Sequence, residues 1–206
     1  MADSNVRFDG DGAAIAGIYR DVPDAVAAAL LITGSGKLDR DSDNRMLKTT
    51  VTRDVARALT EARVATLRYD KRGVGASGGS YLNSGMTERL ADAQTAFDWL
   101  AGTAPGLPLL VVGHSEGTYH AAEIAAADSR VAGAVLLAGY VGSGEQILNR
   151  QIEVMADKLP RSARVIMKLV HVDFARSQRK RLEQTRTRPV RGATARPYAS
   201  RLALKC

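Results

Sequence analysis

Ser115 is the residue whose surroundings most favour chemistry. It lies in the pentapeptide GHSEG (113–117), which follows the apolar run LLVV and precedes an alanine-rich segment with helical spacing. Such a sequence between a buried strand and a helix favours a tight turn that strains the serine backbone, and Gly113 and Gly117 avoid the collisions that side chains would make there. The turn would expose the Ser115 hydroxyl as a nucleophile and leave the backbone N–H of Glu116 free to stabilise an oxyanion. This pattern predicts acyl transfer through a covalent intermediate on the serine.

A second Gly-x-Ser-x-Gly match, GASGG (75–79), shows that the pattern alone is weak. It follows a charged loop and leads into GSYLNSG rather than into a helix, so it lacks the context of a nucleophile turn. The alternative for residues 113–117 is a glycine-rich strand-to-helix turn without chemistry.

A nucleophilic serine needs a base, and the chain has three histidines: His114, His120 and His171. His114 is part of the turn itself, and His120 is expected on the helix behind Ser115, where its ring cannot reach the hydroxyl. His171, with Asp173 two residues further on, is a weak candidate for the base. The alternative for His171 is a partly buried histidine of a helix.

Glu145 is a weak candidate for the acid that would orient the base, because it follows the predicted strand 131–138 closely. A solvated helix start is the alternative for this residue. Without a base, Ser115 is a poor nucleophile at neutral pH, although an oxyanion hole alone can leave roughly 10³-fold acceleration over water. We therefore expect a hydrolase architecture with weak or absent activity.

The surrounding pattern predicts an α/β fold. Short apolar runs alternate with amphipathic helical segments from residue 6 to about 142. The expected strands are a hairpin over 6–22 around Asp9 to Gly12, then 25–32, 64–69, 107–112 and 131–138. Three helices are expected. The first spans 46–62, with Ser42 to Asn44 as cap candidates and one face formed by Leu47, Val51, Val55, Ala58, Leu59 and Ala62. The second carries a stripe of Leu90, Ala93, Phe97 and Leu100, and the third spans 116–127. Buried strands separated by helices indicate a mostly parallel sheet with right-handed crossovers.

Three motifs, in order along the chain, resemble the α/β-hydrolase fold, with the serine aminopeptidase-like and small-acyl hydrolases as the nearest subgroup. LLITGSGKLDRDSDN (30–44) resembles the oxyanion loop after the third strand, RYDKRGVGASGGS (68–80) the loop after the fourth, and GHSEG the nucleophile turn after the fifth. The resemblance implies Ser115 as the nucleophile, oxyanion N–H groups from Glu116 and Ser35, and a small-molecule acyl substrate with no cofactor. Thr33 departs from the family, which often has histidine at this position. The family's acid and histidine follow its seventh and eighth strands, beyond the six predicted here.

Two other interpretations of the loop after residue 33 fail. GSGK (34–37) is not a phosphate loop, because Leu31 stands where a glycine is required. The aspartates at 39, 41 and 43 do not form a calcium loop, because Asn44 stands at the glycine position. No metal site is predicted, and Asp70 and Arg72 are expected to form a loop-bracing ion pair rather than to catalyse.

Charge and composition divide the 206 residues further. Residues 176–206 carry a net charge of +9 and residues 1–175 carry −2, so the overall +7 belongs to the tail. We expect a hydrolase core over 1–142, a helical cap segment over 143–184 and a basic, disordered tail over 185–206. The apolar runs are too short to span a bilayer, no signal peptide is apparent, and the only cysteine is Cys206, so a cytoplasmic location is expected.

The change of character near residue 184 has two interpretations. One is a frameshifted or otherwise truncated product that has lost the last strands, the acid and the base. The other is a non-catalytic binding module whose basic tail contacts anionic partners, since contact with nucleic acid is unlikely except through that tail. The oligomeric state is left open.

Overall fold

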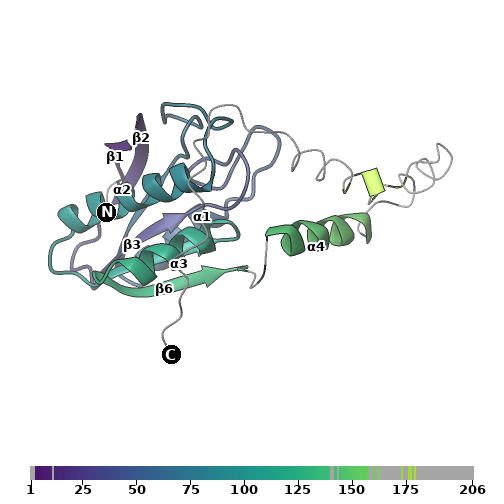
Figure 1. The fold of residues 1–206 in the computed structure, drawn as a ribbon. Helices are drawn as coiled ribbons and strands as arrows, with labels where there is room; N and C mark the ends of the chain where they lie inside the picture. The colour runs from purple at the N-terminus through teal and green to yellow at the C-terminus, as the bar shows by residue number, and fades with distance from the viewer. Residues whose placement is uncertain are drawn as a thin grey trace. The chain divides into compact units, whose positions relative to one another are not determined.

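The computed structural model describes residues 3–10, 12–139, 142, 144–157, 160, 162, 173, 176, 177 and 179. The chain divides into two compact units, Met1–Tyr140 and Val141–Cys206, and each is described by itself. Figure 1 shows their helices and strands; the second unit contributes the helix α4 (Gly144–Asp157). The expected cap over 143–184 and tail over 185–206 stay predictions, and residues 185–206 lie outside the described part.

The first unit is built on a six-stranded sheet in the order β1-β2-β4-β3-β5-β6. Its strands are β1 (Asp3–Gly10), β2 (Ala13–Arg20), β3 (Ala27–Ile32), β4 (Val64–Tyr69), β5 (Leu109–His114) and β6 (Val131–Leu137). β1 and β2 form the predicted antiparallel hairpin, in which Gly10 pairs with Ala13, and β2 is antiparallel to β4. The pairs β3–β4, β3–β5 and β5–β6 are parallel. The predicted α/β class with a mostly parallel sheet is confirmed.

Helices cover both faces of this sheet. They are α1 (Val51–Glu61), α2 (Met86–Thr103) and α3 (Gly117–Ala127). Leu30 of β3 joins Phe97 of α2 and Ile124 of α3 in one apolar cluster, whereas the next residue, Leu31, joins Ala56 of α1 in a second cluster. Because successive side chains of a strand point to opposite faces, α1 covers one face and α2 with α3 the other. All six residues of β3 are buried, which explains its uninterrupted apolar sequence.

The prediction for the first helix is partly wrong. The helix begins at Val51 and not near residue 46, and Leu47, which was expected on its buried face, is 56% exposed. Asn44 does not cap the helix; its side-chain oxygen accepts hydrogen bonds from the amides of Met46 and Leu47, both at 2.8 Å. Short polar side chains that bond to nearby amides compete with helix formation, which explains the late start.

The buried face of α1 also differs from the predicted one. Thr52, Ala56 and Thr60 are buried, whereas Ala58 and Ala62 are exposed. The Ser42 hydroxyl, expected near the cap, is instead buried and hydrogen-bonded to the Thr52 hydroxyl. This hydrogen bond gives the buried Thr52 hydroxyl a partner, which the spacing of apolar residues does not reveal.

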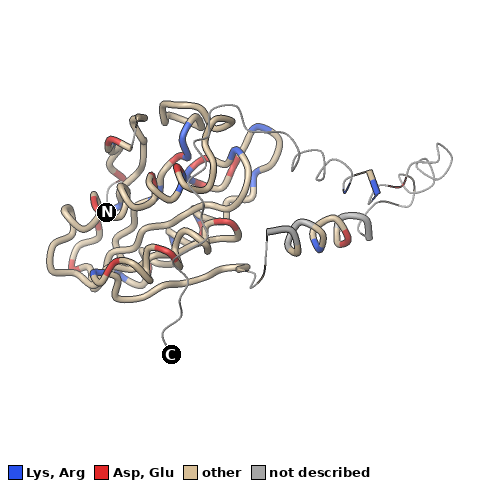
Figure 2. The backbone as a smooth tube through the Cα atoms, viewed as in Figure 1, with Lys and Arg blue, Asp and Glu red and all other residues tan. Residues whose placement is uncertain are grey.

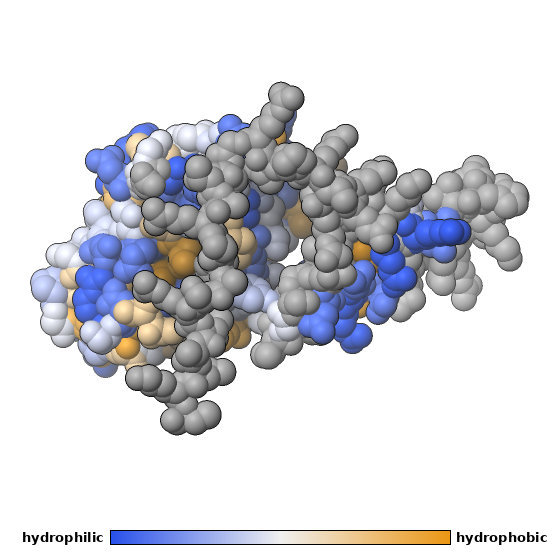
Figure 3. Space-filling model, in the orientation of Figure 1, coloured by the Kyte–Doolittle hydropathy of each residue, from blue (hydrophilic) through white to orange (hydrophobic). Residues whose placement is uncertain are grey.

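β6 is the last strand on its side of the sheet in the described part of the chain, and none of its residues is buried. The large apolar side chains of Val135 and Leu136 are 43% and 51% exposed. The face of the first unit drawn in Figure 3 mixes hydrophilic and hydrophobic residues, and in Figure 2 lysine and arginine lie interspersed with aspartate and glutamate. Of the helices described, none combines the length and apolar character needed to cross a bilayer.

Candidate active site

Ser115 lies in the turn between β5 and α3 with a left-handed backbone, φ +51°. This region is unfavourable for a side chain with a Cβ and persists only where neighbouring bonds enforce it. The Ser115 N–H donates to the carbonyl of Leu137 at 2.9 Å, and the Ser115 carbonyl accepts from the N–H of Thr118 at 3.0 Å and from its hydroxyl at 2.6 Å. The strained conformation is therefore held from β6 on one side and from α3 on the other.

The two glycines of the turn allow the strand and the helix to approach closely. A methyl group at Gly113 would lie 2.3 Å from the carbonyl oxygen of Gly117, and one at Gly117 would lie 2.3 Å from that of Ile32. Both contacts are with backbone, which cannot move aside as a side chain can. The first turn of α3 thus packs directly on the ends of β5 and β3.

The loop after β3 lies against this turn. A methyl group at Gly34 would be 3.3 Å from the Cβ of Ser115 and 3.0 Å from Nδ1 of His114. Thr33, which departs from the family pattern, is buried, and Ser35 is exposed. The structure therefore brings the predicted oxyanion loop into contact with the predicted nucleophile. The assignment of the Ser35 and Glu116 amides as oxyanion donors stays a prediction.

The second Gly-x-Ser-x-Gly sequence has a structural role in the loop after β4. The Ser77 hydroxyl donates to the carbonyl of Asp70 at 2.7 Å and accepts from the N–H of Ala16 at 2.9 Å. Gly75 and Gly79 both have positive φ, +55° and +80°, and the next helix begins only at residue 86. Ser77 therefore joins the loop after β4 to β2.

Asp70 and Arg72 each find a separate partner. The Asp70 carboxylate, 2% exposed, accepts from Nε of Arg40 at 3.0 Å, from Nη2 at 2.5 Å and from the amide of Ala76 at 2.8 Å. Arg72 donates to both carboxylate oxygens of Asp92, at 3.0 and 2.6 Å. Burial raises the pKa of Asp70, but the bonds from Arg40 and Ala76 hold it below its usual value. The loops after β3 and β4 are thus locked together by buried charge.

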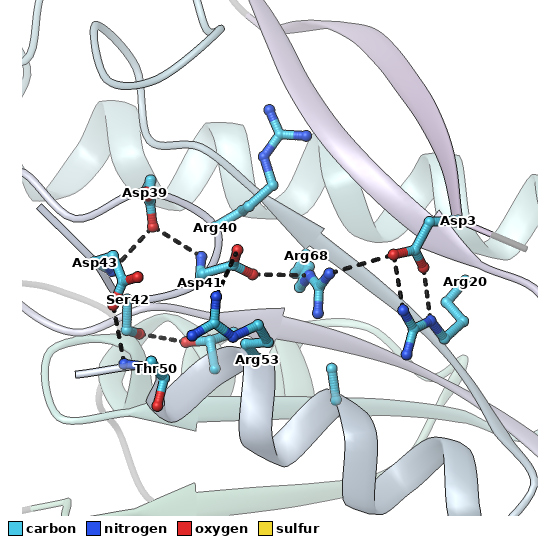
Figure 4. A network of polar contacts seen from close by, with 12 residues as sticks. Asp3, Arg20, Asp39, Arg40, Asp41, Ser42, Asp43, Thr50, Arg53 and Arg68 are labelled. Carbon is cyan, nitrogen blue, oxygen red and sulfur yellow. Dashed lines mark hydrogen bonds and ion pairs between the residues drawn. The ribbon is translucent and has the colours of Figure 1, made fainter. Parts of the chain in front are cut away.

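The aspartates after residue 38 serve the fold of their own loop, as Figure 4 shows. The Asp39 carboxylate accepts from the amides of Asp41 and Asp43, at 3.0 and 2.9 Å. Asp41 lies 3.2 Å from Nε of Arg68, a buried residue of β4 that also approaches Asp3 at 3.7 Å. Burial lowers the pKa of the Arg68 guanidinium, and both carboxylates oppose this shift. No group of three or more His, Cys, Asp or Glu able to hold a metal ion occurs among the described residues.

His114 and His120 are both held in their neutral forms by burial. His120, on α3, is 3% exposed, and burial lowers its pKa to about 4; burial also lowers the pKa of His114. Nδ1 of His114 and Nε2 of His120 are buried without a hydrogen-bond partner among the described residues. Neither ring is hydrogen-bonded to Ser115 in this part of the chain. A small cavity of about 10 Å³ lies beside His114, lined also by Leu31, Val55 and Leu137.

The two weak candidates for the remaining catalytic groups are not placed. His171 lies outside the described residues, and the backbone of Glu145 belongs to α4 while its side chain is not described. Both stay predictions.

Two residues that the sequence did not single out do approach the turn: Lys71 and Arg89 lie 3.3 and 3.2 Å from the Glu116 carboxylate. The lysine within the motif RYDKRG is the sequence signal from which Lys71 could have been identified.

The arrangement of these elements defines an α/β-hydrolase fold, and the comparisons agree. A family model described as serine aminopeptidase, S33, matches residues 48–198, so the chain belongs to this hydrolase family. No match was found among curated proteins.

Solved structures share the fold at low sequence identity. The α/β hydrolase GrgF from Penicillium sp. sh18 is 23% identical with a TM-score of 0.58, over 80% of this chain and 55% of that one. The esterase Pf2001 from Pyrococcus furiosus is 17% identical with a TM-score of 0.61, over 81% and 59%. An α/β serine hydrolase homologue from Coxiella burnetii is 20% identical with a TM-score of 0.54, over 66% and 62%. The chain thus spans 55% to 62% of the length of these proteins.

Proposed function

We propose that this protein is a serine hydrolase of carboxylic esters, thioesters or amides that reacts through an acyl-enzyme on Ser115. The observation that carries the proposal is the φ of +51° at Ser115, in a turn between β5 and α3 whose glycines exclude side chains and against which the Gly34 loop is packed. Membership of the serine aminopeptidase family supports it. So does the similarity of fold to Pf2001, which is an esterase, although that activity belongs to that protein.

In the proposed reaction the Ser115 oxygen attacks the carbonyl carbon of the substrate and its proton passes to a base. The carbonyl oxygen gains negative charge and accepts hydrogen bonds from the amides of Glu116 and Ser35. Collapse of the tetrahedral intermediate expels the alcohol, thiol or amine, which takes up the proton. A water molecule then attacks the acyl group in the same way, which releases the acid and restores the serine hydroxyl.

The proposed reaction needs a base for Ser115. His120 is buried and His114 is half-buried, and neither ring is hydrogen-bonded to Ser115 among the described residues, so His171 and Glu145 stay the weak candidates for base and acid. We accordingly propose that the activity of this chain is weak. An oxyanion hole without a working base is worth roughly 10³-fold over water in serine proteases, which is still measurable.

The test is hydrolysis of p-nitrophenyl acetate and of a short thioester by the full chain, with Ser115→Ala as the decisive variant. Ser77→Ala is the matched control. Ser77 stands in the other Gly-x-Ser-x-Gly sequence, and the described bonds of its hydroxyl are with the backbone of Asp70 and Ala16. We expect Ser115→Ala to abolish the acyl-enzyme and to lower turnover to the residual level that the oxyanion hole alone supports. Ser77→Ala should keep the wild-type rate at temperatures where it stays folded. Wild-type turnover in both Ser115→Ala and His171→Ala would refute the serine mechanism.

A further inference from the structure

Lys71 is a buried cation beside the proposed oxyanion hole. It follows the end of β4, and only 6% of its side chain is exposed. Its Nζ donates to the carbonyl of Gly34, to the carbonyl of Gly36 at 3.3 Å and to Oε1 of Glu116 at 3.3 Å. A lysine ammonium has three donors and no acceptor, so these three bonds use its whole capacity. Lys71 is therefore fully engaged by the protein and is not available to bind a substrate.

One of these bonds holds the peptide group that carries the Ser35 N–H. The Gly34 carbonyl and the Ser35 N–H belong to the same planar trans peptide, in which C=O and N–H point in opposite directions. When Lys71 holds that carbonyl, it also sets the direction of the Ser35 N–H. The bond to the Gly36 carbonyl holds the Gly36–Lys37 peptide further along the same loop, where Gly36 has a left-handed φ of +93°.

The third bond reaches the second proposed oxyanion donor. Glu116 is the N-cap residue of α3, and its carboxylate is bound by Lys71 at 3.3 Å and by Arg89 of α2 at 3.2 Å. Arg89 otherwise donates to the carbonyl of Ser84 at 3.0 Å and stacks on Tyr81, with 4.6 Å between its Cζ and the ring centroid. Lys71 differs from Arg89 in one respect: it also holds the loop after β3.

We propose that Lys71 is a positioning residue that orients the Ser35 peptide toward the reacting carbonyl and holds it in register with Glu116. The inference rests on the proposed function, because an oxyanion hole has a purpose only if Ser115 reacts. Lys71 touches no reacting atom. Burial lowers the pKa of its amine, and the Glu116 carboxylate opposes that shift.

The first test is structural and independent of activity. In the full chain, Lys71→Met removes all three donors. Arg89→Met is the matched control: it removes the other cation on Glu116, together with the bond to the Ser84 carbonyl and the contact with Tyr81, and it leaves the Lys71 bonds to Gly34 and Gly36 in place. The Leu38 N–H, which donates to the Gly36 carbonyl at 2.9 Å, reports the order of the loop. We expect its hydrogen exchange to rise at least about tenfold in Lys71→Met, with a shifted Ser35 amide resonance, and to stay within about twofold of the wild type in Arg89→Met. Unchanged Leu38 exchange in Lys71→Met would overturn the inference.

The second test is kinetic. Loss of one oxyanion donor costs about 10²–10³-fold in kcat, so misorientation of one should cost about 10- to 100-fold. We expect this fall in Lys71→Met with KM within about threefold, and a kcat within about threefold of the wild type in Arg89→Met. Equal kcat values in the two variants, or a fall confined to KM, would contradict a positioning role.

A further variant covers the case in which Lys71→Met does not fold. Lys71→Arg keeps the positive charge beside Glu116, but its planar fork does not reproduce the geometry of three bonds from one ammonium. We expect it to fold, with kcat about tenfold lower; a wild-type kcat and wild-type Leu38 exchange would overturn the inference. Failure of the proposed function would look different, because wild type and Ser115→Ala would then have equal rates while the exchange data still decide whether Lys71 orders the loop.

Discussion

β3 and β6 have similar apolar sequences, AAALLI and VAGAVLL, and opposite environments. Every residue of β3 is buried between α1 on one face and α2 with α3 on the other, whereas no residue of β6 is buried. The loop after β3 is bonded to the rest of the first unit through Arg40 and Lys71. Apolar composition therefore identifies a strand, but it does not tell whether other elements of the fold cover the two faces of that strand.

The surroundings of Ser115 show the same contrast between the β3 side and the β6 side. On the β3 side of Ser115, the loop, the glycines and the buried ion pairs form a continuous set of contacts. On the β6 side, the described contacts with the turn include the bond from the Ser115 N–H to Leu137 and the packing of Gly139 against Thr118. The loop that carries the proposed oxyanion donor Ser35 lies on the first side, whereas His171 and the side chain of Glu145, the weak candidates for base and acid, lie outside the described part.

The largest effect is expected from breaking the buried ion pair between Asp70 and Arg40, on the β3 side of Ser115. Asp70→Asn leaves the Arg40 guanidinium without its counter-charge in a site where Asp70 is 2% exposed, which should lower the free energy of unfolding by about 3 to 5 kcal/mol. Asp98→Asn is the matched control, because its pair with Arg130 is about half exposed and should cost less than about 1 kcal/mol. Urea unfolding of both variants measures the difference, and equal losses would contradict the contrast.

A smaller but still large loss is expected from Gly117→Ala. Its methyl group would lie 2.3 Å from the Ile32 carbonyl oxygen, so strand and helix must separate, at a cost of about 3 kcal/mol. Gly102→Ala in α2, where nothing lies within 4 Å, should instead stabilise the helix by about 0.5 to 1 kcal/mol. Thermal melts of the two variants should move in opposite directions. A Gly117→Ala melt at or above the wild-type temperature would show that the turn is not tightly packed.

The fold was largely predictable where local signals agree with long-range contacts. The Asp-Gly pairs gave the hairpin, the uninterrupted apolar runs gave the central strands, and GHSEG gave the turn at Ser115. The start of α1 was not predictable from apolar spacing, because the Asn44 side chain bonds to local amides and keeps that segment out of the helix. The partners of Asp70 and Glu116 could not be inferred either, since Arg40 and Lys71 meet them only through the arrangement of three separate loops.

Leucine truncation compares the two strands directly. Leu31→Ala in β3, where the side chain is 1% exposed, should lower the free energy of unfolding by about 2 to 5 kcal/mol through lost burial and a new cavity. Leu136→Ala in β6, where the side chain is 51% exposed, should change it by no more than about 0.5 kcal/mol. A loss of more than about 2 kcal/mol in Leu136→Ala would mean that β6 is covered in solution.

The smallest effect concerns pH. The pKa of His120 is about 4 in the folded chain against an ordinary value of 6.5, so the unfolded chain binds more protons between these values. The contribution is complete above about pH 6.5 and is lost as pH falls toward 4, which amounts to about 2 kcal/mol between pH 7 and pH 4.5. His120→Gln should reduce the difference between unfolding free energies measured at these two pH values by that amount. An unchanged difference would show that His120 can take up a proton while folded.

The most direct test of the central claim is covalent capture of the nucleophile. The full chain is incubated with an alkyl fluorophosphonate, which reacts with an activated serine through a charged transition state that an oxyanion hole stabilises. Peptide mass spectrometry then locates the adduct. We predict a single adduct on Ser115, formed more slowly in Lys71→Met than in Arg89→Met, and no modification of Ser77. An unmodified Ser115, or labelling spread equally over the serines of the chain, would contradict the account.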